Sequence, residues 1–145
     1  MLVLLAVVSG TACGLKNLGS SSLPAEVETA IATITDDLEW ERYDKIYAEA
    51  SSLWKRDSTL EESTEVLKKL RTQLGKVKNR AMNSATEQRN SGGPLQGHVF
   101  IISYQTTFAG ASGTETLAAM ETFTLLEEDG RWALARYFVN STALK

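Results

Sequence analysis

The chain has 145 residues, of which 43% are hydrophobic and 23% charged, so its length and composition suit one globular domain with a buried core. Its formal net charge of −3 excludes the broad basic surface that proteins use to hold a nucleic-acid backbone. One cysteine excludes an internal disulfide and one histidine excludes a histidine-rich metal site within one chain, so we expect no metal or other cofactor.

The N-terminal segment is typical of an export signal. An apolar run from Leu2 to Val8 is too short for a membrane-spanning helix, which needs about 20 residues, and it leads into the small residues Ser9–Ala12 and the sole cysteine, Cys13. This order resembles a bacterial lipobox, in which the signal is cut before a cysteine whose thiol carries lipid. We therefore predict a lipoprotein signal peptide over residues 1–12 and a lipid on Cys13. The alternative is a buried N-terminal strand with an inert cysteine.

A polar segment follows the cysteine. Residues 13–23 show no apolar periodicity and include three successive serines, so we predict a flexible tether. The lipid would hold a single α+β domain, residues 24–145, at a membrane of the bacterial cell envelope. Gly14 stands where an Asp would retain a lipoprotein at the inner membrane, which favours the outer membrane, facing the periplasm, in a Gram-negative source.

Three helices are predicted next. Pro24 suits the first turn of a helix, and apolar residues recur at helical spacing over residues 27–38. A second apolar stripe, rich in aromatic residues, covers residues 40–54. Ser58–Glu61 fits a capping box ahead of a third helix, which ends at Gly75 because glycine tolerates a left-handed cap.

Beyond Gly75 the pattern changes from helical spacing to alternation. Four strands are predicted, at residues 76–87, 98–108, 114–126 and 132–139, with a loop at 88–97 and a tight Asp129-Gly130 hairpin turn. This order predicts an α+β fold, with three N-terminal helices packed on one face of a curved four-stranded antiparallel sheet. The expected core side of the sheet comprises Phe100, Ile102, Tyr104, Phe108, Phe123, Trp132, Leu134 and Phe138.

Four stretches carry a resemblance to a known family: Ala48–Lys55, Leu74–Arg80, Tyr104–Phe108 and Glu121–Tyr137. Their order and spacing are similar to those of an uncharacterised bacterial family, the domain of unknown function numbered four thousand and nineteen, whose members are commonly small exported proteins or lipoproteins. The family looks like a relative of the cystatin-like cone folds typified by nuclear transport factor two (NTF2) and ketosteroid isomerase. The resemblance implies helices wrapped by a curved sheet, the NTF2-like cone, and it assigns no catalytic residue.

Two residues are candidates for acid/base chemistry. Glu121 could act as a general base if burial inside a cone raised its pKa. Glu115, on the same predicted strand, would lie about 20 Å from it, so the two cannot act as a carboxylate pair. His98 opens a strand beside a glycine-containing loop. The commoner alternatives are a salt-bridged or solvent-facing Glu121 and an exposed His98 without a functional role.

Aromatic and basic side chains form two further groups. The aromatic stripe of the second helix either packs in the core or lines a ligand pocket between helices and sheet, and we place Trp40, Tyr43, Tyr104 and Glu121 at that possible pocket. Basic residues alternate along the first long strand, at Lys76, Lys78 and Arg80. They either protect a sheet edge from pairing or meet an anionic group.

These observations leave two functions open. The shortage of reactive residues favours a membrane-anchored, non-catalytic binding or interaction module. Its partners would be the membrane, through the lipid on Cys13, and an envelope protein or a small apolar ligand, with no nucleic acid. The alternative is a small enzyme or ligand-binding protein that uses the cone pocket, with Glu121 or His98 as the acid/base group. A filled pocket would favour the first, and an apolar pocket around an up-shifted carboxylate would favour the second.

Overall fold

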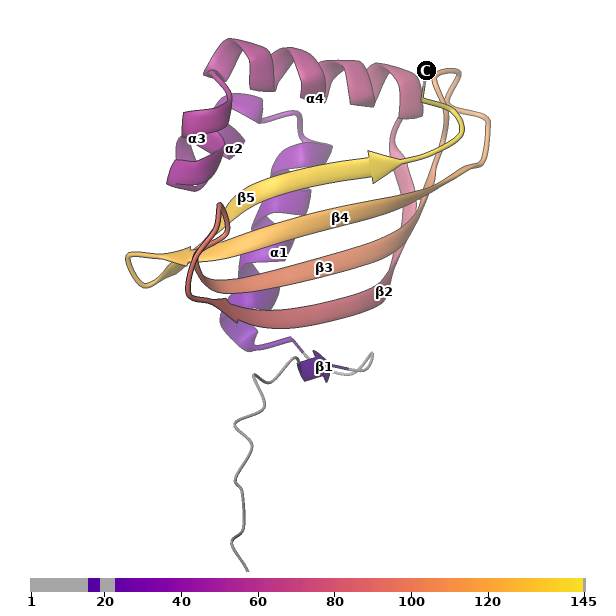
Figure 1. Ribbon diagram of the computed structural model, residues 1–145. Coiled ribbons are helices and arrows are strands. Elements are labelled where there is room, and N and C mark those ends of the chain that lie inside the picture. Colours follow the sequence, from indigo (N-terminus) through magenta and orange to yellow (C-terminus); the bar gives the residue numbers. More distant parts are fainter. Residues whose placement is uncertain (1–15, 19–22, 145) are drawn as a thin grey trace, which may run out of the picture.

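The computed structural model describes residues 16–18 and 23–144 (Figure 1). Within them the fold is α+β, with four helices followed by four long strands, and a short strand, β1 (Lys16–Leu18), precedes the helices. The predicted signal peptide and Cys13 lie outside the described residues, so lipid attachment stays a prediction. The described part of the predicted tether, β1, pairs antiparallel with Ala85–Glu87. Such pairing uses backbone N–H and C=O groups, so three residues can form it without an apolar pattern in the sequence.

Helix α1 (Ala25–Glu39) covers one face of the sheet (Figure 1). It begins directly after Pro24, as predicted, and its apolar stripe buries Val27 and Ile31 against the sheet. Trp40, which we assigned to the second helix, instead lies in the turn after α1 and is 69% exposed. The chain reverses there through Glu41, whose φ of 55° is left-handed, and this turn directs the indole to solvent.

The second predicted helix is two short helices, α2 (Tyr43–Glu49) and α3 (Ser52–Asp57). Ser51 separates them, because its hydroxyl accepts a hydrogen bond from the backbone N–H of Trp54 and so caps α3. The backbone N–H of Ser51 donates to the carbonyl of Leu134 at 3.0 Å, which ties the break to the sheet. The structure therefore has four helices where the sequence pattern predicted three.

Helix α4 (Leu60–Leu74) begins one residue later than predicted. Its capping box uses Thr59 and Glu62, each satisfying a free backbone N–H of the other. Its end is as predicted, at Gly75, whose φ is 75°. A Cβ at Gly75 would lie 2.1 Å from the carbonyl oxygen of Gly110, so the junction between α4 and the sheet requires glycine.

The described sheet has the order β1-β2-β3-β4-β5, with every neighbouring pair antiparallel. The tight turn between the last two strands is confirmed, because Asp129 and Gly130 both have positive φ, as a type I′ hairpin turn requires. The loop predicted at residues 88–97 is shorter, and Glu115 lies in a loop rather than on a strand. The bounds of the long strands are β2 Val77–Asn90, β3 Gly97–Phe108, β4 Leu117–Glu128 and β5 Arg131–Asn140.

Three register shifts decide which side chains face the helices. In β2 the pairing with β3 skips Lys78 and Asn83, and in β5 the pairing with β4 skips Ala135. Each extra residue reverses the alternation beyond it. Phe138, which we predicted in the core, consequently points to solvent and is 61% exposed, while its neighbour Tyr137 points inward.

The main core lies between α1, α2 and the inner face of the sheet. Phe100, Ile102 and Phe123 are fully buried there, as predicted, and each contributes about 1.5–3 kcal/mol by its burial. Tyr104 and Trp132 are only partly buried and pack against this cluster. Among the helices of residues 23–144, none has the length and apolar character needed to cross a membrane.

Candidate functional site

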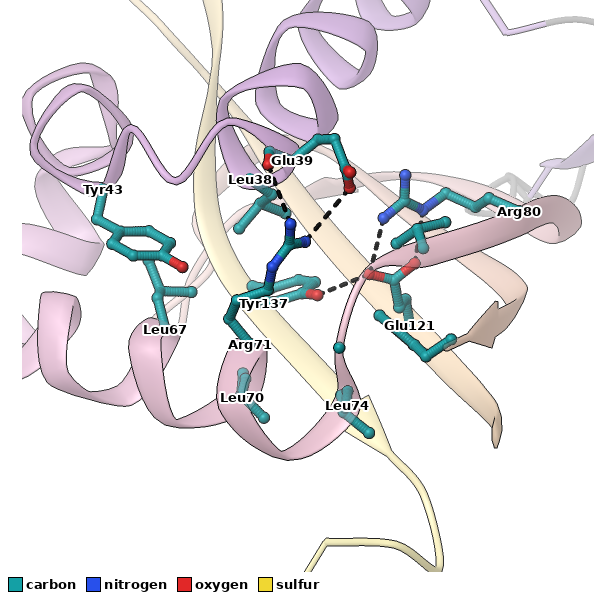
Figure 2. A pocket seen from close by; sticks show the side chains of 13 residues that line it. Leu38, Glu39, Tyr43, Leu67, Leu70, Arg71, Leu74, Arg80, Glu121 and Tyr137 are labelled. Carbon is teal, nitrogen blue, oxygen red and sulfur yellow. Dashed lines mark hydrogen bonds and ion pairs between the residues drawn. The ribbon is translucent and has the colours of Figure 1, made fainter. Parts of the chain in front are cut away.

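A pocket opens between α4 and the inner face of the sheet (Figure 2). Its space amounts to about 40 Å³, which is room for a few water molecules. One wall is formed by helical residues and the other by strand residues. The lining comprises Leu38, Glu39, Tyr43, Leu67, Leu70, Arg71, Leu74, Gly75, Val77, Arg80, Phe108, Glu121 and Tyr137.

Glu121 is the buried carboxylate of this pocket, with no exposed surface. It accepts two hydrogen bonds from the Arg80 guanidinium, at 2.6 and 3.1 Å. The hydroxyls of Thr106 and Tyr137 donate to its two oxygens at 2.5 and 2.6 Å. Both carboxylate oxygens are therefore hydrogen-bonded twice, and the negative charge is balanced by a neighbouring cation.

Side chains of β2, β3 and β5 converge on Glu121, and those of β2 and β5 do so because of register shifts. Glu121 lies on β4, opposite Tyr104 of β3. The extra residues Lys78 and Asn83 bracket Arg80 and place it on the inner face, and the shift at Ala135 does the same for Tyr137. With unbroken alternation along each strand, the arginine and the tyrosine would point to the outer face of the sheet.

The burial of this cluster changes its acid–base behaviour. Burial opposes the charge on Arg80, yet its hydrogen bonds to Glu121 raise the pKa of the guanidinium above its usual value. Burial, together with repulsion from the Glu121 carboxylate, raises the pKa of the Tyr137 hydroxyl well above its ordinary value. Burial likewise raises the pKa of Tyr43 to about 12. The two tyrosines are therefore neutral hydrogen-bond donors at physiological pH.

A second ion pair lies at the mouth of the pocket. Arg71 of α4 donates to the carboxylate and to the backbone carbonyl of Glu39, with both distances 3.4 Å. Figure 2 shows the two side chains facing each other across the opening. At this length the bonds are weak compared with those between Arg80 and Glu121.

His98 lies elsewhere on the inner face. Its ring nitrogens contact the carboxylates of Glu87 at 2.7 Å and Glu127 at 2.8 Å, and its ring packs edge-on against Trp132. It is six residues along β3 from Tyr104, the strand partner of Glu121, which corresponds to about 20 Å. His98 and Glu121 therefore do not form one site.

The structure brings together half of the residues that we placed at a pocket. Tyr43 and Glu121 line it, whereas Trp40 and Tyr104 do not. Of the basic residues on the first long strand, Arg80 pairs with buried Glu121, so the edge-protection interpretation is wrong for it. Lys78 donates to the backbone carbonyl of Glu115 at 2.7 Å.

Sequence reasoning missed Arg71, Glu39, Thr106 and Tyr137. Thr106 had left a signal, because it is a polar residue between Tyr104 and Phe108 on the core side of a strand. The other three residues left no such signal. Simple alternation along the strand places Tyr137 on the outer face, and only the register shift reverses this. Arg71 lies on a helix that has many other charged residues.

In residues 16–18 and 23–144, the His, Cys, Asp and Glu side chains form no group of three or more that could hold a metal ion. The chemistry available at the pocket is that of guanidinium, phenol and carboxylate groups beside leucine side chains.

Comparison with known families finds a match over residues 29–137, to a family described as "Protein of unknown function (DUF4019)". The match spans most of the chain. The chain belongs to this family. All pocket-lining residues fall within the matched span, so the pocket lies in the family's domain. The family predicted from the four sequence stretches is thereby confirmed. No curated protein matches the chain.

Proposed function

We propose that this chain is a lipid-anchored protein of the bacterial cell envelope and that its folded domain is a non-catalytic binding module. The hydrogen bonding of Glu121 is the main support for a non-catalytic role. A general base needs a free lone pair directed at its substrate, but both oxygens of Glu121 are occupied by the chain's own donors. Both ring nitrogens of His98 are also engaged, by Glu87 and Glu127.

The anchoring half of the proposal rests on the sequence. The apolar run, the small residues and Cys13 stand in the order of a lipoprotein signal, and the family resemblance points to exported proteins. Leu23, buried in the domain, follows Cys13 by ten positions. A lipid on Cys13 would thus keep the pocket close to a bilayer, where an envelope protein or a small ligand can reach it.

The finer fold assignment belongs to the same proposal. Helices on one face of an antiparallel sheet, with a pocket on the inner side, are consistent with the cystatin-like, NTF2-like cone that the resemblance implies. Small ligands of such an arrangement enter between the helices and the sheet, where the pocket lies here.

The alternative is an enzyme with Glu121 or His98 as the acid/base group. One observation favours it, since Glu121 lines the pocket. It requires Glu121 to exchange its hydrogen bonds with Arg80, Thr106 and Tyr137 for bonds to a substrate.

Replacement of Cys13 by Ser tests the anchor. In a bacterial host, the unmodified chain should have the mass of a lipid-bearing protein starting at Cys13 and should partition into detergent. Cys13→Ser should remove the lipid mass and release the protein from detergent, with its thermal unfolding unchanged. Ser20→Ala, a nearby change outside the lipobox, should behave like the unmodified chain. An unmodified chain that keeps Met1 and partitions into water would overturn the proposal.

A further inference from the structure

The pocket holds four charged groups that differ in burial. The side chains of Arg71 and Arg80 are 16% and 18% exposed, that of Glu121 is fully buried, and that of Glu39 is 38% exposed. The deeply placed charges are therefore two guanidinium groups and one carboxylate. Glu39 balances the excess positive charge, and its side chain is the most exposed of the four.

The two ion pairs differ in geometry as well. Arg80 and Glu121 make a two-point contact with a shortest distance of 2.6 Å, reinforced by Thr106 and Tyr137. Arg71 reaches Glu39 only at 3.4 Å. A long contact to a partly exposed carboxylate stabilises little, because both the distance and the solvent around Glu39 weaken the attraction. Glu39 can therefore be displaced from Arg71 at small cost, whereas Glu121 cannot be displaced from Arg80.

The wall beside Arg71 is apolar. Leu67, Leu70 and Leu74 of α4 line the pocket together with Leu38 and Phe108. Arg71 comes from the same helix as the three leucines (Figure 2). The hydroxyl of Tyr43 also faces the pocket, and its one assigned bond, to Glu41, is long at 3.3 Å. The site thus combines a weakly paired cation, a neutral phenol donor and an aliphatic wall.

We infer that this pocket binds a small aliphatic carboxylate, with Arg71 holding the carboxylate in place of Glu39. The guanidinium presents two parallel donors to a carboxylate, and the methylene groups of the ligand lie against the leucines of α4. Displaced Glu39 turns to solvent and adds its own volume to the pocket. Arg80 does not take part, because Glu121 already neutralises it. This inference rests on the proposed binding module and names its ligand class. It does not depend on the lipid anchor.

Titration of the full chain carrying Cys13→Ser with sodium butyrate tests the inference, because this form needs no detergent. Amide shifts in a ¹H–¹⁵N spectrum should move with saturation at residues 67–77, which surround the pocket. Butylamine and butanol, of the same length, should cause no saturable shift there. Affinity should rise about fourfold for each added methylene from acetate to butyrate. Equal responses to butyrate and butylamine, or no saturable response, would overturn the inference.

Two variants act in opposite directions. Arg71→Met keeps an aliphatic side chain but removes the cation, so butyrate should bind about tenfold more weakly or worse. Lys68→Met, on the same helix away from the pocket, is the matched control and should bind like the parent. Glu39→Gln removes the competing carboxylate and should tighten butyrate binding about two- to fivefold.

Glu39→Gln tests the inference even if Arg71→Met fails to fold. Its expected result is tighter butyrate binding, which a misfolded protein cannot give. Unchanged or weaker butyrate binding in Glu39→Gln would contradict the displacement of Glu39 by the ligand. If the unmodified chain partitions into detergent but butyrate does not bind, the lipid anchor stands and only the proposed ligand class is rejected.

Discussion

Asp37 and Glu121 are the two acidic residues that are buried in the described chain, and each has cationic partners. Arg42 and Lys45 contact Asp37 at 2.6 and 2.9 Å and join the end of α1 to α2. Arg80 contacts Glu121 and joins β2 to β4 across β3. Removing one member of such a pair leaves the other charge without compensation in a poorly solvated place, which is the main energetic consequence.

The Glu121–Arg80 pair should therefore show strong coupling. Glu121→Leu and Arg80→Met should each lower the free energy of unfolding by about 3–5 kcal/mol, because each leaves a buried partner unpaired. The double variant should lose much less than the sum, since it removes both charges. Urea unfolding of the four proteins measures the cycle. Arg136→Met, on the outer face of β5, serves as a control within about 0.5 kcal/mol of the parent. Additive losses would show that the two side chains act independently.

Asp37 should make the fold sensitive to acid. Burial favours the protonated carboxyl, but the hydrogen bonds and charges of Lys45 and Arg42 outweigh it and lower the pKa of Asp37 below its usual value. The folded state then binds the proton less tightly than the unfolded state, whose Asp pKa is about 3.9. The stabilisation is therefore complete above that pH and is lost as the pH falls through the lower folded pKa.

The variant Asp37→Asn should expose this dependence. At pH 7 it should be less stable than the parent by about 1.5–3 kcal/mol, the worth of hydrogen bonds to a charged group. Below about pH 4 the difference should shrink, because the unfolded parent takes up a proton at Asp37 there and the folded parent does so at still lower pH. Thermal unfolding of both proteins between pH 7 and pH 2 measures the gap. A gap that stays constant over this range would exclude Asp37 as the source of the acid sensitivity.

At the scale of elements, the junction between α4 and β2 is a close backbone contact. The chain turns at Gly75 with positive φ, and the backbone of Gly110 lies against it. The N–H of Gly110 donates to the carbonyl of Leu74 at 2.8 Å, and that of Ala109 donates to Lys76 at 2.8 Å. This contact holds the C-terminal end of α4, and with it the leucines and Arg71, over the sheet.

The variant Gly75→Ala should be strongly destabilising. Its Cβ would meet the Gly110 carbonyl oxygen at 2.1 Å, and alanine is also strained at a φ of 75°. Gly113→Ala is the control for positive φ, since Gly113 has a φ of 80° but, in the described part of the chain, no atom beyond its two chain neighbours within 4 Å of its Cβ position. The control should lose about 1–2 kcal/mol from backbone strain alone, and Gly75→Ala clearly more, in urea unfolding. Equal losses would show that the close approach of Gly110 has no energetic weight.

At the scale of the whole molecule, the four helices precede the four long strands in the chain, and α1 covers one face of the sheet (Figure 1). The core therefore joins residues far apart in sequence, such as Val27 of α1 and Phe100 and Phe123 of the sheet, which belong to one buried cluster. Such a core forms as one cooperative unit, and Leu23 and Val27 are the first buried side chains within residues 23–144.

The position of this limit is testable by truncation. A chain beginning at Leu23 keeps every residue of the main core and should unfold in a single cooperative transition. A chain beginning at Ala32 loses Leu23, Val27 and Ile31, and each such loss costs about 2–5 kcal/mol, so it should not fold. Circular dichroism during thermal unfolding distinguishes the two. Loss of the cooperative transition in the longer chain would place essential contacts before residue 23.

The sequence alone was sufficient for the order and type of most elements, the α+β class, the glycine at the end of α4 and the Asp129-Gly130 turn. These features depend on spacing and on backbone preferences within a few residues, which a sequence displays directly. It also singled out Glu121, for which it left open a general base, a salt-bridged residue or a solvent-facing residue, and the structure shows the salt bridge.

The tertiary structure decided which side chains meet. The break at Ser51 requires the carbonyl of Leu134, which lies far along the chain. The register shifts at Lys78, Asn83 and Ala135 exist only relative to the partner strands, and a shift of one residue exchanges the two faces of a strand. For that reason Arg80 and Tyr137 reach Glu121 and Phe138 reaches solvent, although local alternation predicts a different set of inward residues.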